Sequence, residues 1–283
     1  MTREKQIILV QPYLSMKAKD YRGMFAGHTD VLGFYEFSVK DGWPGHFQAV
    51  PDGSTDLVFG IGSRDVKTYI GGTVLKAKGW EFEEGRTYFG IRFCPGKCIL
   101  PKDLSIKDVV DADLELSPYA YGSTFLEQIA GMHTLEQKAD LFLQHFSKQE
   151  QRENGTIRNI ETYVRKRIYE SGGNISIAEL TEETGYSESY LRRAFGQIHG
   201  ISPKVFEGFV RFQRFLKEIS VAGTCMSTEE AALACGYYDQ SHMMKDFKRF
   251  AGMTPEQHKK LILNSRRPVW DYQRLKSLQE CQN

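Results

Sequence analysis

The sequence lacks the features that mark exported or membrane-spanning chains. It contains no apolar run near the roughly 20 residues that a bilayer span needs. Its first apolar stretch, Ile7 to Val10, is shorter than the ~7 to 15 residues of a signal-peptide core. Its five cysteines are an odd number without paired spacing, which fits a reducing compartment better than a disulfide framework. We therefore expect a cytoplasmic chain with no membrane partner.

The sequence also lacks recognisable motifs for catalysis, metal binding or cofactor binding. No pair of histidines has HxH or HExxH spacing, so a catalytic metal site is not expected. The pair Gly60 and Gly62 is not followed by a third glycine and a helix, which excludes the dinucleotide fingerprint. No serine or cysteine has a nucleophile motif around it. We expect no enzymatic activity, no catalytic residues, no cofactor and no metal.

Neither sign of charge dominates the chain, whose formal net charge is +1. Lys and Arg number 18 against 21 Asp and Glu over residues 1–156, and 17 against 13 over residues 157–267. The first part is therefore mildly acidic and the second mildly basic. A basic segment of this kind favours a nucleic-acid partner.

Short alternating apolar stretches and most of the glycines gather in residues 1–118. Segments such as 31–39, 56–61 and 87–93 alternate as strands do. Turn signatures such as Pro51-Asp52-Gly53 separate them. We therefore predict a mostly β barrel or sandwich that serves as an effector or dimerisation domain.

From about Ser123 the apolar residues take the helical period. Those between Phe125 and Phe146 recur every three or four positions, up to a polar stretch that reads SKQEQRENG. The predicted fold class is α+β. Its predicted parts are the β domain over residues 1–118, a helical connector and linker over 119–155, an all-α domain over 156–267 and a C-terminal tail over 268–283.

The all-α region contains an internal repeat. One copy starts at Thr184 and reads TGYSESYLRRAFGQIHGISPKVF, and the other starts at Cys235 and reads CGYYDQSHMMKDFKRFAGMTPEQH, with one extra residue in its turn. Glycine, aromatic and proline positions match between the copies. Each copy predicts a helix, a turn containing glycine and a second helix. This is the helix-turn-helix unit, whose second helix can enter a DNA major groove.

Each copy carries its own signals for where its helices begin. Ser176 with Glu179, and Ser227 with Glu230, form capping boxes that predict the start of the first helix of each unit. Pro203 follows a serine and predicts the start of a further helix between the units. The sequence repeat therefore predicts that the same arrangement of helices occurs twice.

The predicted second helices carry polar and basic side chains opposite their apolar residues. Arginine can bond both acceptors of a guanine edge and glutamine can pair with adenine, so these faces can read bases. Basic residues on a helix are often only solvated charge, but the repeat favours recognition. The candidate DNA-binding residues are Ser189, Arg192, Arg193 and Gln197 in the first unit and Gln240, Ser241, His242, Lys245 and Lys248 in the second. For His242 two roles stay open, a bond to a DNA phosphate or a local contact.

An apolar-rich segment, Pro203 to Ser220, lies between the two units. It predicts ~25 Å of helix at about 1.5 Å per residue. Its apolar residues surround much of the helix, so we expect it to pack against both units. A spacer of that length can hold two recognition helices near the ~34 Å that separates successive major grooves.

The second copy contains GYYDQSHMMKDFKRFAGMTPEQH, a stretch close to the signature of AraC/XylS-type bacterial transcription regulators. Over residues 157–262 the chain resembles the DNA-binding domain of that family. The N-terminal part is similar to a sensor-type domain of one family branch, through the segments VPDGSTDLVFGIG, YIGG and GIRFCPG. The resemblance implies binding of double-stranded DNA through both units, contact with RNA polymerase, and an N-terminal domain that binds a small-molecule effector or forms a homodimer.

The resemblance also implies base contacts for three residues in each unit, namely Ser189, Arg192 and Arg193, and Gln240, Ser241 and Lys245. Some positions depart from the family pattern. Glu188 puts an acid at the start of the first recognition helix, where it suits the helix dipole but repels phosphate. Asp246 and Thr181 also differ, and Thr181 stands where the second copy has the smaller Ala232. The target preference of relatives therefore does not carry over to this chain.

Several aromatic residues and one arginine of the N-terminal part can line an effector pocket, because ligand sites combine apolar walls with a few polar anchors. The same residues can instead form the hydrophobic core. The candidates are Trp43, Phe59, Trp80, Tyr88 and Arg92. Cys94 and Cys98 also allow two roles: a redox or metal site, since the adjacent Lys97 can lower a thiol pKa, or small apolar residues on neighbouring strands.

These observations together predict a non-enzymatic, sequence-specific DNA-binding transcription regulator. An effector or self-association in the N-terminal domain is expected to shift how the DNA-binding region is presented. An alternative of another class is a ligand-binding or enzymatic β domain whose helical half mediates protein contacts. The pocket aromatics favour that alternative, whereas the repeat favours the regulator.

Overall fold

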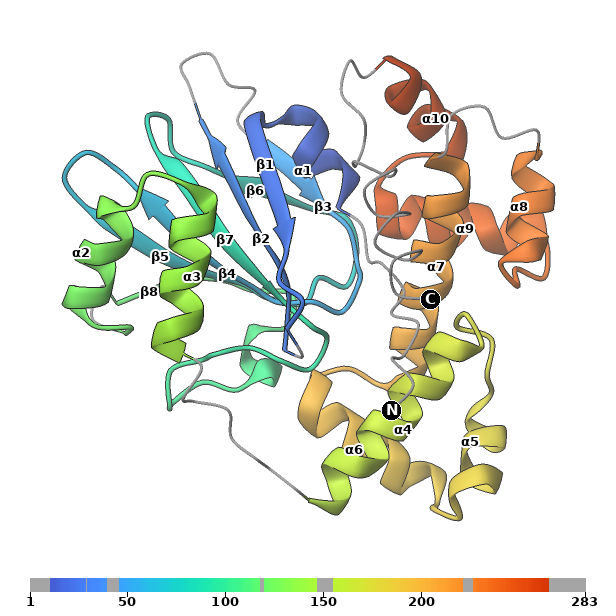
Figure 1. Ribbon diagram of the computed structural model, residues 1–283. Helices are drawn as coiled ribbons and strands as arrows, with labels where there is room; N and C mark the ends of the chain where they lie inside the picture. The colour runs from blue at the N-terminus through green and yellow to red at the C-terminus, as the bar shows by residue number, and fades with distance from the viewer. Residues whose placement is uncertain are drawn as a thin grey trace.

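The chain folds into a sheet-containing N-terminal half and a helical C-terminal half that lie side by side (Figure 1). The computed structural model describes residues 11–28, 30–39, 46–117, 120–146, 155–220 and 226–264. The predicted α+β class is confirmed. Among these described residues, no helix has both the length and the apolar character needed to cross a membrane.

The main sheet of the N-terminal half is antiparallel and has the strand order β1-β2-β7-β4-β5-β8. Its strands are β1 (Lys19–Phe25), β2 (Val31–Ser38), β4 (Asp56–Ile61), β5 (Val66–Gly71), β7 (Thr87–Phe93) and β8 (Asp113–Leu116). A second, smaller sheet pairs β3 (His46–Ala49) with β6 (Lys78–Glu81). Because β1 and β8 lie at opposite ends of the order, the main sheet is open. Of the two forms predicted, the structure has the sandwich-like one.

The two faces of the main sheet have different covers, since successive side chains of a strand point to opposite faces. One face packs against α2 (Ser123–Gly131) and α3 (Leu135–Phe146). On that face the ring of Phe59 meets Phe125, and Phe34 meets Phe142. The two helices within 119–155, the range predicted as a connector, therefore complete the core of the sheet.

The other face of the main sheet packs toward the smaller sheet. Its buried residues include Tyr35, Phe37, Val58 and Tyr88, with Trp80 and Phe82 packed against them. The small sheet, the turn before β4 and α1 (Pro12–Lys17) lie on the side of the molecule that meets the helical half.

The helical half contains α4 (Thr156–Glu170), α5 (Ile177–Thr184), α6 (Glu188–His199), α7 (Pro203–Ser220), α8 (Thr228–Ala234), α9 (Gln240–Ala251) and α10 (Pro255–Asn264). Both predicted capping boxes are present, Ser176 with Glu179 and Ser227 with Glu230. The helix predicted between the units runs from Pro203 to Ser220, as expected.

The two halves share one hydrophobic core. Tyr13 and Val50 of the N-terminal half are buried in the same cluster as the apolar residues of the C-terminal helices. The 3-10 helix η1 (Ile106–Val109) adds a contact with α6. Burial of apolar surface between the halves therefore fixes how they sit together.

Candidate nucleic-acid interface

The first helix-turn-helix unit consists of α5, a turn and α6. Gly185 ends α5 with a φ of 70°, a left-handed conformation that glycine adopts without steric cost. Ser187 then caps α6 by accepting a hydrogen bond from the backbone N–H of Tyr190. The buried residues of α6 are Leu191, Ala194, Phe195 and His199. This leaves four of the predicted DNA-binding residues exposed: Ser189, Arg192, Arg193 and Gln197.

The second unit repeats this arrangement with α8, a turn and α9. Asp239 caps α9 by accepting a hydrogen bond from the backbone N–H of His242. The residues that α9 buries are Met243, Phe247, Phe250 and Ala251. The predicted DNA-binding residues Gln240, Ser241, Lys245 and Lys248 are exposed, and His242 is half-buried. Both recognition faces are thus accessible in the described part of the chain.

Several of the exposed side chains already have partners on the protein surface. Arg192 forms an ion pair with Glu188 one turn earlier in α6. The Nε2 of Gln240 donates to the carboxylate of Glu229 at 3.0 Å. Exposed pairs of this kind contribute only ~0 to 1 kcal/mol. These side chains can therefore exchange their present partners for groups of a nucleic acid.

His242 makes a local contact in this structure. Its Nε2 lies 3.6 Å from Oδ2 of Asp246, and its ring packs edge-on against Tyr237 with centroids 5.3 Å apart. Arg211 of α7 also approaches Asp246, at 4.0 Å. His242 thus makes a local contact here, and its bond to a DNA phosphate stays a prediction.

Helix α7 packs against both units, as its apolar residues predicted. The ring of Phe206 meets Phe195 of α6, with centroids 5.5 Å apart. Further along the helix, Phe212 meets both Phe247 and Phe250 of α9, at 5.6 Å and 5.2 Å. Protein interiors are close-packed and resist deformation. The packing of both units against α7 therefore fixes the position of α6 relative to α9.

A buried hydrogen bond to a carboxylate fixes the C-terminal end of α6. Nε2 of His199 donates to Oε1 of Glu161 in α4 at 2.7 Å, and Arg165 donates to the same oxygen at 2.7 Å. Burial by itself raises the pKa of Glu161, but the bonds from His199 and Arg165 outweigh it and lower the pKa to about 2. Burial lowers the pKa of His199. A neutral His199 therefore donates to an ionised Glu161.

The C-terminal ends of both recognition helices contact the sheet half. A Cβ on Gly200, which follows α6, would lie 2.5 Å from Cγ2 of Val110. A Cβ on Gly252, which follows α9, would lie 2.3 Å from Nε2 of Gln48. Gln48 donates from that nitrogen to the carbonyl oxygen of Ala251 at 2.7 Å. The N-terminal half thus holds the ends of α6 and α9 and leaves their outer faces exposed.

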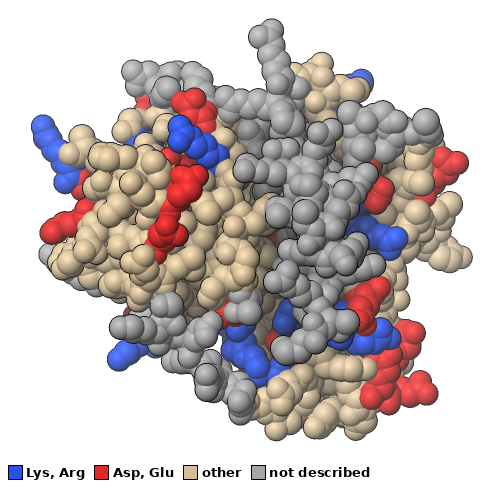
Figure 2. All heavy atoms as spheres, in the orientation of Figure 1, with Lys and Arg blue, Asp and Glu red and all other residues tan. Residues whose placement is uncertain are grey.

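Charge on the helical half is mixed in sign on the face that Figure 2 shows, where Lys and Arg lie among Asp and Glu. Ion pairs such as Arg167 with Glu170 and Glu183 bring the two signs together. The two signs of charge therefore offset one another over this side of the molecule.

The structure places the predicted effector residues in different environments. Trp80 and Arg92 line the same hollow between the two sheets. Phe59 lies on the opposite face of the main sheet, against Phe125 of α2. Tyr88 is buried between the sheets, where its hydroxyl accepts a hydrogen bond from the backbone of Glu83. Trp43, like the tail over 268–283, falls outside the described residues.

Sequence reasoning missed two carboxylates beside Arg92. Nη1 of Arg92 donates to Oδ2 of Asp56 at 2.9 Å, and Nη2 forms an ion pair with Asp52. Asp52 belongs to a turn signature that predicts a reversal of the chain but no partner. The pairing of Asp56 with Arg92 follows from the register of β4 against β7, which the sequence alone does not reveal.

Of the two cysteines in the segment Cys94 to Cys98, Cys94 is buried and Cys98 is half-buried. Burial raises the pKa of Cys94 to about 11 and also raises the pKa of Cys98. The sequence allowed two roles for these cysteines, a reactive one and an apolar one. The raised pKa values favour the apolar role, because the thiolate is the form that reacts and binds metals. Over the described ranges, the side chains form no group of three or more His, Cys, Asp or Glu that is suited to a metal ion.

Comparison with known proteins gives matches in the helical half and matches that cover up to 86% of the chain. A family model for a helix-turn-helix domain matches residues 180–260. A probable AraC family transcriptional regulator from Rhodopseudomonas palustris is 29% identical over 36% of this chain and 95% of its own, with a TM-score of 0.34. ToxT from Vibrio cholerae is 12% identical over 86% of this chain and 99% of its own, with a TM-score of 0.41. A structure of ToxT with a bound unsaturated fatty acid is 13% identical over 84% and 98%, with a TM-score of 0.41. No curated protein matches the chain.

The matched residues coincide with the two units built above. They run from Leu180 in α5, through α6, α7, α8 and α9, into α10. The internal repeat, the observed caps and the family model thus all point to the same segment. This chain contains a helix-turn-helix domain at residues 180–260.

Proposed function

We propose that this chain is a sequence-specific transcription regulator that binds double-stranded DNA. The observation that carries the proposal is the repeated unit: two helix-turn-helix units share α7, and each leaves a polar and basic recognition face exposed. The match to a helix-turn-helix family over residues 180–260 supports the same function. In this proposal α6 and α9 enter successive major grooves from one side of the duplex.

Base recognition is assigned to the exposed side chains of α6 and α9. Arg192 and Arg193 are suited to guanine edges, and Gln197 and Gln240 to adenine edges. The guanidinium of Arg193 lies 5.2 Å from the centre of the Tyr190 ring, so its stem is already oriented before DNA arrives. Ser189, Ser241, Lys245 and Lys248 complete the contacts, and His242 joins them once it leaves Asp246.

The length of α7 supports the proposal that α6 and α9 bind two successive major grooves. Its 18 residues correspond to ~27 Å of helix, and the first unit packs near its start while the second packs along its middle. The centres of two recognition helices held in this way come close to the ~34 Å spacing of major grooves on one face. A modest bend of the duplex brings the remaining bases into contact, as many DNA-binding proteins require.

Control through the N-terminal half is part of the proposal. A small-molecule effector or self-association of two chains acts on a half that contacts the ends of both recognition helices, through Gly200 and Gly252. Either event changes how α6 and α9 are presented, which shifts the population of the binding-competent form. RNA polymerase is the further partner that the resemblance implies.

The test starts from DNA fragments that the purified chain selects from a random pool. Binding to a selected fragment is then measured by fluorescence anisotropy for Arg193→Ala and Lys245→Ala. Loss of a bidentate base contact at Arg193 is expected to weaken binding about 5- to 100-fold and to relax preference at one position. Lys245→Ala is expected to weaken binding and to reduce the dependence on salt.

The matched control is Lys102→Ala, an exposed lysine of the sheet half, which is expected to bind as the parent chain does. Footprinting is expected to show protection over two consecutive turns of the duplex. Protection of a single turn, or unchanged affinity in both Arg193→Ala and Lys245→Ala, contradicts the assignment of the recognition faces.

A further inference from the structure

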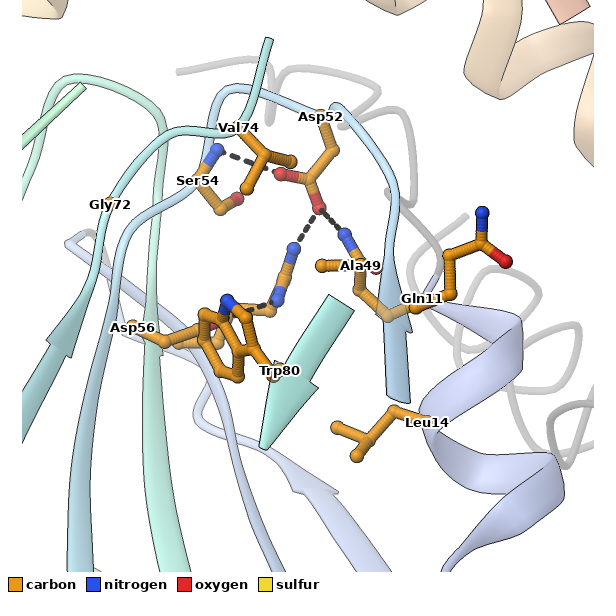
Figure 3. A pocket seen from close by; sticks show the side chains of 11 residues that line it. Gln11, Leu14, Ala49, Asp52, Ser54, Asp56, Gly72, Val74 and Trp80 are labelled. Carbon is orange, nitrogen blue, oxygen red and sulfur yellow. Dashed lines mark hydrogen bonds and ion pairs between the residues drawn. The ribbon is translucent and has the colours of Figure 1, made fainter. Parts of the chain in front are cut away.

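A small hollow lies between the main sheet, the small sheet and α1, beside Arg92. Its volume is about 30 Å³, which is room for about two water molecules. Figure 3 shows Ser54, Asp56 and Trp80 arranged around it, with Leu14 of α1 on the opposite side. Both polar and apolar side chains therefore line the hollow.

Four buried polar atoms of the residues that line this hollow make no hydrogen bond within the part of the chain that the structure describes. They are Oγ of Ser54, Oδ1 of Asp56, Nε1 of Trp80 and Nε of Arg92. Ser54 is 5% exposed and Asp56 is 7% exposed. Buried polar groups are normally paired, because an unmade bond in the interior is costly. Such a cluster around one hollow indicates a site suited to a hydrogen-bonding group.

The charges around the hollow balance one another. Arg92 pairs with Asp52 and Asp56. Burial lowers the pKa of Arg92 to about 10, so the guanidinium stays protonated at neutral pH, and burial raises the pKa of Asp56 well above its ordinary value. Arg92 and Asp52 then cancel, and the raised pKa of Asp56 favours its uncharged form. A charged occupant would bring an uncompensated charge into a buried site, which is strongly unfavourable.

The unpartnered atoms also specify the hydrogen-bonding character of the occupant. Nε of Arg92 and Nε1 of Trp80 are donors only, so they require acceptors. The hydroxyl of Ser54 both donates and accepts, and so does the carboxyl group of Asp56 when it is protonated. The fitting group has no charge and carries both a carbonyl or hydroxyl oxygen and a donor hydrogen.

We propose that this hollow binds the uncharged polar end of a small molecule, of the primary amide or alcohol class, and that the turn over residues 50–54 transmits its binding to α7. An amide offers its carbonyl oxygen to the donors of Arg92 and Trp80 and its N–H to Ser54 or Asp56. It replaces the two waters that the hollow can hold, and the rest of the molecule extends along Leu14 toward solvent.

The turn over residues 50–54 lies between the hollow and α7. On the side of the hollow, Asp52 bonds to Arg92, to the backbone N–H of Ser54 at 2.9 Å and to Gln11 at 3.0 Å (Figure 3). An occupant that bonds to Oγ of Ser54 and Nε of Arg92 leaves these contacts in place but holds two of the residues that fix Asp52. The position of Asp52 is therefore coupled to the filling of the hollow through Ser54 and Arg92.

The other side of the same turn is bonded to α7. The carbonyl oxygen of Pro51 accepts a hydrogen bond from Nε2 of Gln213 at 2.9 Å, and the Gln213 side chain is fully buried. Gly53 lies so close to α7 that a Cβ there would be 2.5 Å from Cε2 of Phe206. A shift of this turn is therefore passed to α7, the helix against which both recognition units pack.

The effect of this shift on DNA binding rests on the proposed function, whereas occupation of the hollow and its transmission to α7 do not. The two can thus be tested without DNA. The probes are acetamide, acetate and guanidinium, which each have four heavy atoms and differ in charge. Ligands of this size bind no tighter than about 0.1 mM.

Occupation is measured on the full chain by NMR of the indole N–H groups with ¹⁵N-labelled tryptophan. The Trp80 signal is identified by its loss in Trp80→Phe. Acetamide is expected to shift this signal in a saturable manner, and acetate and guanidinium are not. Ser54→Ala is expected to weaken the response at least threefold, while the exposed control Ser63→Ala leaves it unchanged. A response that does not saturate by about 100 mM, or an equal response to acetate, overturns the site.

Transmission is measured by hydrogen exchange with and without acetamide, using acetate at the same concentration as a reference. Peptides covering 203–220 are expected to change their exchange rate, whereas peptides covering 123–146, on the far face of the main sheet, are not. A shift of Trp80 without any change over 203–220 overturns the transmission. If both responses occur but the chain selects no DNA, the proposed function fails and this inference stands.

Discussion

The hydroxyl of Tyr13 lies 3.0 Å from Nδ1 of His258, and the two rings pack edge-on with centroids 5.7 Å apart. Nε2 of His258 lies 2.9 Å from Oγ of Ser220, whose hydroxyl donates to the carbonyl of Leu216. Ser220 therefore accepts from Nε2–H, and Nδ1 accepts from Tyr13. A neutral imidazole in one tautomer thus joins α1 of the sheet half to α7 and α10 of the helical half.

Removing the tyrosine hydroxyl is expected to weaken this connection. In Tyr13→Phe, Nδ1 of the buried His258 loses its donor, which lowers the free energy of unfolding by ~1 to 2 kcal/mol. The control is Tyr163→Phe, because Tyr163 bonds to Glu183 on the exposed surface and its loss is expected to cost less than ~0.5 kcal/mol. Urea unfolding of the three proteins checks this, and equal stability of both variants contradicts it.

The stability of the chain is expected to depend on pH through the same histidine. Burial lowers the pKa of His258 to about 4, whereas an unfolded histidine titrates near 6.5. Between these values the unfolded state binds the proton and the folded state does not. The contribution is complete above pH ~6.5 and declines as the pH falls toward ~4, by up to roughly 3 kcal/mol. In His258→Gln the free energy of unfolding is expected to change less between pH ~6.5 and ~4 than in the parent chain. The same pH dependence in both proteins would contradict the prediction.

The contact of Gln48 with the C-terminal end of α9 predicts a difference in stability between alanine variants of two glycines with similar conformation. Gly252 and Gly185 have φ values of 66° and 70°. A Cβ on Gly252 would lie 2.3 Å from Gln48, while among the described residues nothing lies within 4 Å of a Cβ on Gly185. Gly185→Ala is expected to cost ~1 kcal/mol of backbone strain, and Gly252→Ala a further ~1 kcal/mol because Gln48 must move and lose its hydrogen bond to Ala251. Chemical denaturation measures the free energy of unfolding of both variants. Equal losses would show that the contact of Gln48 with the end of α9 does not stabilise the chain.

Glu188 is expected to oppose DNA binding by the first unit. It pairs with Arg192 and places a negative charge at the start of α6. In Glu188→Gln the arginine is released and repulsion from phosphate disappears, so affinity for selected DNA is expected to rise about threefold or more at low salt. Anisotropy titrations at two salt concentrations check this, with Glu136→Gln, an exposed acid on α3, as the control. Unchanged affinity would place Glu188 away from the duplex.

Local signals in the sequence were sufficient for the helical half. The capping boxes at Ser176 and Ser227 mark helix starts, and the helix from Pro203 to Ser220 appears with the predicted ends. Such signals involve residues within one or two turns of each other, so they do not depend on the rest of the fold. The repeat then placed two recognition helices with the same polar and apolar faces.

The hollow beside Arg92 was only partly foreseen. Trp80 and Arg92 were among the candidates and line it, but Phe59 was grouped with them and lies on the opposite face. Alternation along β4 shows that neighbouring residues face opposite ways, but not which face meets a ligand and which meets a helix. Asp52 was seen only as a turn residue, because its partner is 40 positions away in the sequence.

The sequence by itself therefore determined the α+β class, the duplicated helix-turn-helix units and the surfaces that α6 and α9 expose, because helix caps and amphipathic periodicity act over a few residues. Only the tertiary structure decided that α2 and α3 cover the sheet, that Arg92 sits between Asp52 and Asp56, and that the turn beside them touches α7. Those contacts depend on strand register and on packing between distant segments, which short-range patterns do not encode.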